Sequence, residues 1–306
     1  MKLTRSLLRS LLLVLLLVFC SAYPIAVIGV AFDVQPPFSL SWAASALLFL
    51  EGTLVLSAAM LVYDPLRALL AALIVIVLSY LVETLGVTSG FPFGAYHYTD
   101  KLFPHLPGAV PLAVMFAWLL IVFGAIGWVK RRTPAKRGID VGAALLGAVL
   151  ATLLDLAIEP VAAHVVYYWQ WLEPGPLSYY GVPLANFAAW FMVSFVLLLI
   201  VAAVMGGGHP QRVSRREEVA DVRGLETRGI VARQKVQTGE RGEHAQGMTM
   251  RLAVLAPRAV FGGSLFMFGL VDLTHGYYWA ALLAVLGGIL CYLVYRRPFH
   301  SVPPLR

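Results

Sequence analysis

The chain has 306 residues, of which 60% are hydrophobic and 13% are charged. Soluble domains carry charges on about a quarter of their residues, so this composition excludes an ordinary soluble protein and indicates an integral membrane protein. The two cysteines, Cys20 and Cys291, lie in apolar segments at opposite ends of the chain, which argues against a disulfide framework or a cysteine-based metal site. We attribute the net charge of +7 to basic cytoplasmic loops rather than to nucleic-acid binding.

The first segment, MKLTRSLLRSLLLVLLLVFC, is laid out like a signal peptide, with Lys2, Arg5 and Arg9 before an apolar run. The apolar sequence continues to Ala31, which is long enough to span a bilayer. We therefore expect a retained first membrane helix rather than a cleaved signal peptide.

Eight apolar stretches are expected to form membrane helices. They lie near residues 7–30, 39–61, 67–86, 109–129, 139–162, 182–205, 252–271 and 277–295. The predicted fold class is all-α: a polytopic membrane helix bundle of about eight transmembrane helices, forming one domain over residues 1–306. Within it, residues 206–250 carry many charges of both signs and no apolar periodicity, which predicts a flexible polar cytoplasmic loop.

Basic and non-basic connections alternate along these eight stretches. The strongest basic connection is KRRTPAKR at residues 130–137, and the connection containing Lys101 has no other basic residue. The positive-inside rule then predicts that both termini are cytoplasmic, whereas a count of seven spans would break the alternation. The expected location is the cytoplasmic membrane of a bacterium or an archaeon.

This topology brings four polar side chains to the outer side of the bundle. Glu83 ends one span, Asp155 and Glu159 share a helix face four residues apart, and Asn186 begins the following span. Ionisable groups within a membrane are costly and usually mark a functional site. The alternative is that they only hydrogen-bond to one another and lock the helices together. Glu51, near mid-bilayer, is either a further acid or a partner for a neighbouring helix.

The two connections on this side are rich in aromatic residues. They contain Phe91, Phe93, Tyr96, His97, Tyr98 and Phe103, and then Tyr167, Tyr168, Trp169, Trp171, Tyr179 and Tyr180. Some of these residues are expected to be membrane-interface anchors. The intervening strings GFPFG and EPGP predict tight, ordered turns. Helical metal motifs, a Gly-rich phosphate loop and the GxSxG motif are all missing from the sequence.

Two stretches carry a family resemblance: ETLGVTSGFPFGAYHYTDKLFPHLPGAVP and LDLAIEPVAAHVVYYWQWLEPGPLSYYGVPLANFAAW. They resemble the CruF-type carotenoid 1,2-hydratases, a membrane family, most strongly from Glu83 to Trp190. Ala189 stands where the family pattern has glycine. The positions that fit the pattern are Glu83, Gly86, Gly90, Pro92, Phe93, Gly94, Tyr96, Tyr98, Asp155, Pro160, Tyr180, Gly181, Pro183, Asn186, Phe187 and Trp190.

The resemblance implies an enzyme of carotenoid biosynthesis that hydrates the terminal C-1,2 double bond of an acyclic end group to a tertiary alcohol, without a cofactor or a metal. Its partners would be an acyclic or monocyclic carotenoid, water and the bilayer, with neighbouring pathway enzymes as further candidates. From the chemistry, the candidate acids and bases are Asp155 and Glu159 first, with Glu83 as the alternative acid. Candidate substrate-binding residues are Phe93, Tyr96, Tyr98, Tyr180, Asn186 and Trp190.

Two other functional classes remain open at this point. One is a different prenyl-lipid enzyme, such as a prenyltransferase, for which Asp155 and Glu159 would supply half of a magnesium-diphosphate motif. The other is a non-catalytic carotenoid-binding or transport protein. Magnesium dependence would favour the first class, and pigment binding without a change in pigment mass would favour the second.

Overall fold

The computed structural model describes residues 2–34, 37–129, 140–173, 175–206 and 231–296. The helices in this part of the chain are α1 (Lys2–Ala31), α2 (Ala43–Val62), α3 (Pro65–Ser89), α4 (Leu112–Val129), α5 (Val141–Pro160), α6 (Leu184–Gly206), α8 (Val231–Thr274) and α9 (Tyr278–Arg296). Eight of the described helices are long and apolar enough to cross a membrane. The prediction of an all-α, multi-pass membrane bundle is therefore confirmed.

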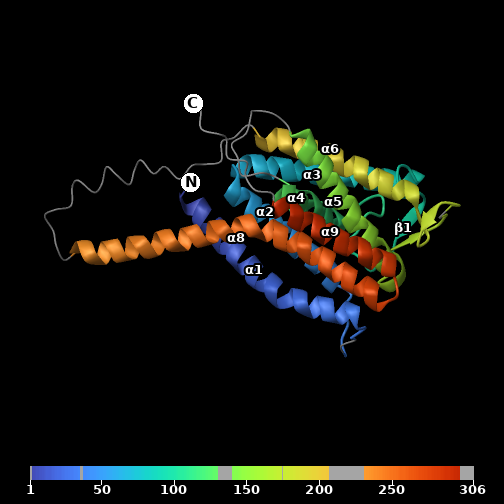
Figure 1. Cartoon of the computed structure of the whole chain (residues 1–306), viewed down its shortest axis with the longest axis horizontal. Helices are drawn as coiled ribbons and strands as arrows, with labels where there is room; N and C mark the ends of the chain where they lie inside the picture. The colour runs from blue at the N-terminus through green and yellow to red at the C-terminus, as the bar shows by residue number, and fades with distance from the viewer. Residues whose placement is uncertain (1, 35–36, 130–139, 174, 207–230, 297–306) are drawn as a thin grey trace.

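The seventh span begins earlier than the sequence predicted. Helix α8 starts at Val231, not near residue 252, and its first part projects beyond the other helices (Figure 1). Alanine, glutamine, arginine and glutamate are good helix formers, so elongation from the apolar half is inexpensive once that half is helical. The chain is thus helical from residue 231 onward, where the sequence predicted a loop over 206–250. Residues 207–230 lie outside the described part, and the flexible, cytoplasmic character of 206–250 stays a prediction.

Local sequence explains where α3 and α5 begin and end. The Asp64 side chain accepts the backbone N–H of Arg67 at 3.0 Å, which caps the start of α3. At its end, Gly90 adopts φ +75°, a left-handed conformation that favours glycine. Helix α5 ends at Pro160, two residues before the predicted end of this span, and the chain continues as one π-helical turn, η1 (Val161–Val165).

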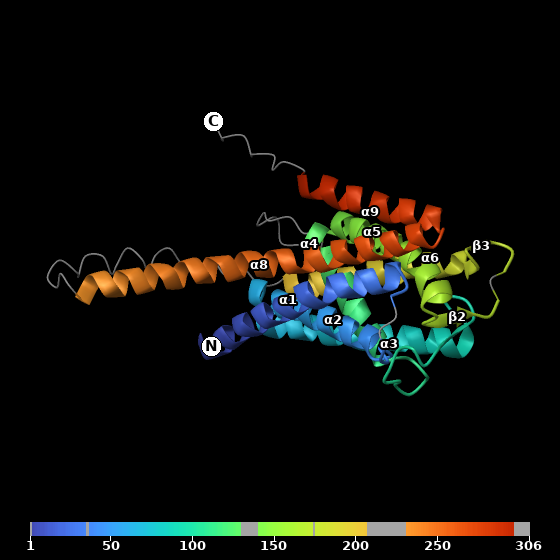
Figure 2. The ribbon, with the colours of Figure 1, turned by 90° about the horizontal axis from the view of Figure 1, so that it is seen from below.

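Helix α4 is the centre of the bundle and packs against α2, α3, α5 and α8. Close contacts between membrane helices require small residues, and Gly52 on α2 provides one: a Cβ there would lie 2.8 Å from the Phe116 backbone oxygen. Helix α1 packs against α2 and α8. It forms the lower edge of the bundle in Figure 1 and lies nearest the viewer in Figure 2, and its Leu12 and Phe19 are buried in the hydrophobic core.

Short strands join the two aromatic connections at one end of the bundle. β1 (Tyr96–Tyr98) pairs antiparallel with β2 (Trp169–Trp171), and β3 (Ser178–Tyr179) pairs with β4 (Val182–Pro183). The start of α1 and the end of α9 lie at the opposite end (Figure 1), as an even number of passes requires. Which end faces the cytoplasm stays a prediction.

Candidate active site

A cavity lies inside the bundle, next to the paired strands β1 and β2. It encloses about 1030 Å³ of empty space, including the open surroundings at its mouth. Most of its wall is aliphatic or aromatic, from α2, α4, α5, α6 and α8. Its polar and aromatic lining consists of Glu51, Glu83, Phe93, Tyr96, Tyr98, Trp118, Glu159, Tyr168, Trp169, Trp171, Asn186, Trp190, Ser264 and Phe268.

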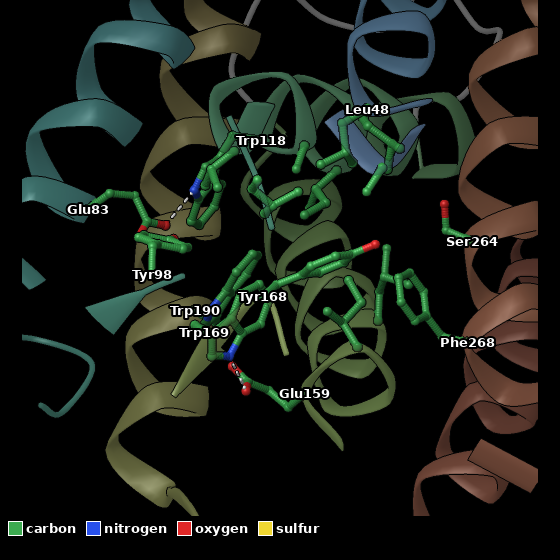
Figure 3. A pocket seen from close by; sticks show the side chains of 18 of the residues that line it. Leu48, Glu83, Tyr98, Trp118, Glu159, Tyr168, Trp169, Trp190, Ser264 and Phe268 are labelled. Atoms are coloured by element: carbon green, nitrogen blue, oxygen red, sulfur yellow. Dashed lines mark hydrogen bonds between the residues drawn. The ribbon is translucent and has the colours of Figure 1, made fainter. Parts of the chain in front are cut away.

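Glu83 is held on one wall by three hydrogen-bond donors. Its Oε2 accepts the hydroxyls of Tyr96 at 2.6 Å and Tyr98 at 2.8 Å, and its Oε1 accepts the indole N–H of Trp118 at 2.9 Å (Figure 3). Burial, and next the charge of Glu83, raise the pKa of Tyr96 and of Tyr98 well above the usual value. Both phenols therefore stay protonated at neutral pH and stabilise a carboxylate at Glu83.

Glu159 is held on another wall in the same manner. Its Oε2 accepts the indole N–H groups of Trp169 at 2.9 Å and Trp171 at 3.0 Å. Its Oε1 accepts the Asn186 amide at 3.0 Å, and the same Nδ2 donates to Oδ2 of Asp155 at 3.1 Å. Asn186 thus links Asp155 and Glu159, and these two carboxyl groups share one face of α5, as their spacing predicted.

The strand pairing joins these two clusters. Tyr96 stands opposite Trp171, and Tyr98 opposite Trp169, with ring centroids 5.1 and 6.0 Å apart. Because residues two apart in a strand face the same side, both phenols and both indoles point into the bundle. One short two-stranded ribbon thereby supplies donors to Glu83 and to Glu159.

Gly86 leaves room for the aromatic cluster one turn from Glu83 on α3. A Cβ at this position would lie 2.7 Å from Cδ2 of Phe93 and 2.9 Å from the Tyr96 hydroxyl. Any larger residue would have to displace one of these rings. The glycine is therefore a requirement of the cavity wall rather than of helix geometry.

Seven of the nine residues that the sequence proposed for the site line this cavity. Asp155 does not: it is fully buried behind Asn186, and its Oδ1 has no hydrogen-bond partner in the described chain. Tyr180 lies elsewhere, in the turn between β3 and β4 that precedes α6. Its carbonyl pairs with the His164 ring at 2.7 Å, and its hydroxyl accepts the backbone N–H of Trp279 at 3.3 Å.

Trp118, Ser264 and Phe268 line the cavity but were missed by sequence reasoning, and of these Trp118 is the one that donates to a carboxyl group. Besides donating to Glu83, it stacks on Trp190 with ring centroids 4.3 Å apart and an interplanar angle of 11°. A tryptophan in the middle of an apolar span was the available signal, because its indole N–H needs an acceptor away from water. Trp169 and Trp171 were noted as aromatic, but their role as donors to Glu159 was not predicted.

Metal binding has no support in the described residues, which contain no group of three or more His, Cys, Asp and Glu side chains able to hold an ion. The carboxyl groups of Glu83, Asp155 and Glu159 instead accept hydrogen bonds from indole, phenol and amide donors.

Residues 44–228 match the family model described as carotenoid biosynthesis protein. The chain belongs to this family. The chain is also similar to the bisanhydrobacterioruberin hydratase of Haloarcula japonica, with 30% identity over 134 residues. That match spans 44% of the chain and 44% of the relative. No solved structure shows significant similarity to the chain. The resemblance seen in the two aromatic connections is thus confirmed as membership of the family.

Proposed function

We propose that this protein is a carotenoid hydratase that adds water across the terminal C-1,2 double bond of an acyclic carotenoid end group and forms a tertiary alcohol. The observation that carries the proposal is the cavity itself: an apolar, aromatic chamber in a membrane bundle, with carboxyl groups on its walls. Family membership and the similarity to a bisanhydrobacterioruberin hydratase support the same chemistry.

The reaction requires three functions from the cavity wall. An isolated alkene is a weak base, so an acid must protonate C-2. The resulting tertiary cation at C-1 must be stabilised, and a base must take a proton from the attacking water. Aromatic faces stabilise cations by about 0.5–2 kcal/mol each, and Tyr98 and Trp190 present such faces in the cavity.

Glu159 is the proposed base. Three of its four lone-pair positions accept hydrogen bonds, two on Oε2 and one on Oε1. The remaining position on Oε1 is available to take a proton from water. Asn186 fixes the orientation of this carboxylate, and Asp155 acts through Asn186 as a positioning residue, since it does not reach the cavity.

Glu83 stabilises the cation electrostatically from a different wall of the cavity. With three donors it is favoured as a carboxylate, and a fixed negative charge near a developing cation lowers the barrier of the reaction. The location of the cavity suits both reactants. The carotenoid is dissolved in the bilayer, whereas water arrives at the end of the bundle where the strands lie.

Pigment analysis tests the proposal. The chain would be expressed in a host that accumulates lycopene or γ-carotene, and the extracted pigments would be analysed by chromatography and mass spectrometry. The expected result is a more polar pigment heavier by one or two waters. Glu159→Gln should reduce its formation about 10²–10⁴-fold, whereas Glu173→Gln, an exposed loop carboxylate, should not.

Unchanged pigment in the presence of folded wild-type protein and either end-group substrate would refute the hydratase proposal. Co-purification of that unchanged pigment would then favour the carotenoid-binding class.

A further inference from the structure

Glu51 differs from the other carboxyl groups of the cavity in having no donor. It projects from α2, is 4% exposed and lines the cavity. No hydrogen bond to its side chain comes from any described residue. Its neighbours on α2 that share the cavity wall are Ala44, Leu47 and Leu48. The proposed function leaves this carboxyl group without a role.

The other two carboxyl groups of the wall are poor proton donors for a physical reason. Glu83 and Glu159 each accept three hydrogen bonds. The indole and amide N–H groups among these donors cannot accept a hydrogen bond in return. These donors favour the charged form of each carboxylate. A buried carboxyl group without any donor is instead favoured in its neutral form, because an unpaired charge is costly to bury.

We propose that Glu51 is the general acid of the hydration and protonates C-2 of the terminal alkene. This assignment rests on the proposed function and gives each carboxyl group of the cavity wall a different role. The walls are suitably placed: α2 and α5 both pack against α4 and α8, which separate them. A double bond between Glu51 and Glu159 is therefore protonated from one face and attacked by water from another.

The step balances as follows. The π electrons of the C-1,2 bond take the Glu51 proton and form a C–H bond at C-2, which leaves a cation at C-1. A lone pair of water forms the C–O bond at C-1, and Glu159 takes a proton from the resulting oxonium. One water has been added, Glu51 is charged and Glu159 is neutral. Transfer of one proton from Glu159 to Glu51 through water restores the enzyme.

Tyr168 provides a neutral polar neighbour for this acid. Its hydroxyl points across the cavity toward the side of Ser264 and Phe268, away from Glu159 (Figure 3). Burial, followed by the charge of Glu51, raises the pKa of Tyr168 to about 12. The phenol therefore stays protonated beside Glu51 and can stabilise the carboxylate that forms once the proton has left.

Deuterium exchange into the carotenoid distinguishes the role of the acid, Glu51, from the role of the base, Glu159. Carotenoid would be added in D₂O to membranes that contain the wild type, Glu51→Gln, Glu51→Asp or Glu159→Gln. The molecular masses of the product and of the recovered substrate would be measured by mass spectrometry. Glu159→Gln keeps the acid, so the cation forms and loses a proton again, and unhydrated substrate gains deuterium. Glu51→Gln should show neither hydration nor exchange, with hydration at least about 10²-fold below wild type. Glu51→Asp should regain part of both.

Hydration by Glu51→Gln within tenfold of wild type would overturn the assignment. So would exchange by Glu51→Gln, or the lack of exchange in Glu159→Gln. Pigment retained by the purified Glu51→Gln protein, at the level found with Glu173→Gln as the matched control, shows that the cavity is intact. A wild type that hydrates nothing in this assay would instead refute the proposed function.

Discussion

Replacing Asn186 with leucine tests whether one amide holds two carboxyl groups in the geometry of the cavity. Leucine has a similar volume and cannot donate, so the variant loses the hydrogen bonds to Asp155 at 3.1 Å and Glu159 at 3.0 Å. Hydrogen bonds between membrane helices contribute about 0.6 kcal/mol on average and up to about 1.7 kcal/mol each. The expected loss in the free energy of unfolding is therefore about 1–3 kcal/mol.

A double-mutant cycle isolates one of these bonds. Asp155→Leu alone removes the carboxyl group and leaves the amide with Glu159 only. The double variant should be more stable than the sum of the single losses predicts, by the coupling energy of the Asn186–Asp155 bond, about 0.6–1.7 kcal/mol. The assay is reversible unfolding in mixed micelles, with pigment conversion measured on the same preparations.

The matched control for the cycle is Ser194→Ala on the same helix. The Ser194 hydroxyl is buried without a partner in the described chain, so its removal should cost little. Strictly additive losses for Asn186→Leu and Asp155→Leu, within about 0.3 kcal/mol, would refute the bridging role. Wild-type conversion by Asn186→Leu would refute its role in orienting the base.

Three further predictions use other parts of the wall. Gly86→Ala should lower pigment conversion at least tenfold, because its Cβ would lie 2.7 Å from a cavity-lining ring. Gly288→Ala should leave conversion unchanged, because nothing lies within 4 Å of its Cβ. Equal conversion by both variants would disprove the tight contact. Trp118→Phe keeps an aromatic ring but loses the indole donor to Glu83. A hydrogen bond to a charged group contributes about 1.5–3 kcal/mol, so conversion should fall about 10- to 150-fold. Trp128→Phe removes an indole N–H that has no partner in the described part of the chain and should not lower conversion. The pKa of Tyr168 is raised to about 12 from a usual 10.0, so its contribution to the free energy of unfolding is fully present below pH 10 and is lost as the pH rises toward 12. Unfolding experiments at increasing pH should therefore show a smaller loss of stability for Tyr168→Phe than for the wild type. An identical loss in both proteins would contradict the shift.

The sequence predicted much of the site, because the spacing of residues along a helix fixes which side chains share a face. Two carboxyl groups four residues apart on a helix share a face in any bundle, so Asp155 and Glu159 could be paired in advance. Topology then placed Glu83 and Asn186 at the same end. The separation of Tyr180 from the cavity could not be predicted, because the path of an irregular turn is set by its contacts with His164 and Trp279.

The sequence by itself determined the membrane environment, the eight spans, the polar end of the bundle and the family. Each of these depends on composition, periodicity or motif, which are local properties of the chain. Only the tertiary structure decided which donor meets which carboxyl group: Trp118 with Glu83, and Trp169 and Trp171 with Glu159. It also decided that Glu51 meets no donor from the described residues. Hydrogen-bond partners far apart in sequence depend on how helices and strands are rotated against one another, and packing fixes that rotation.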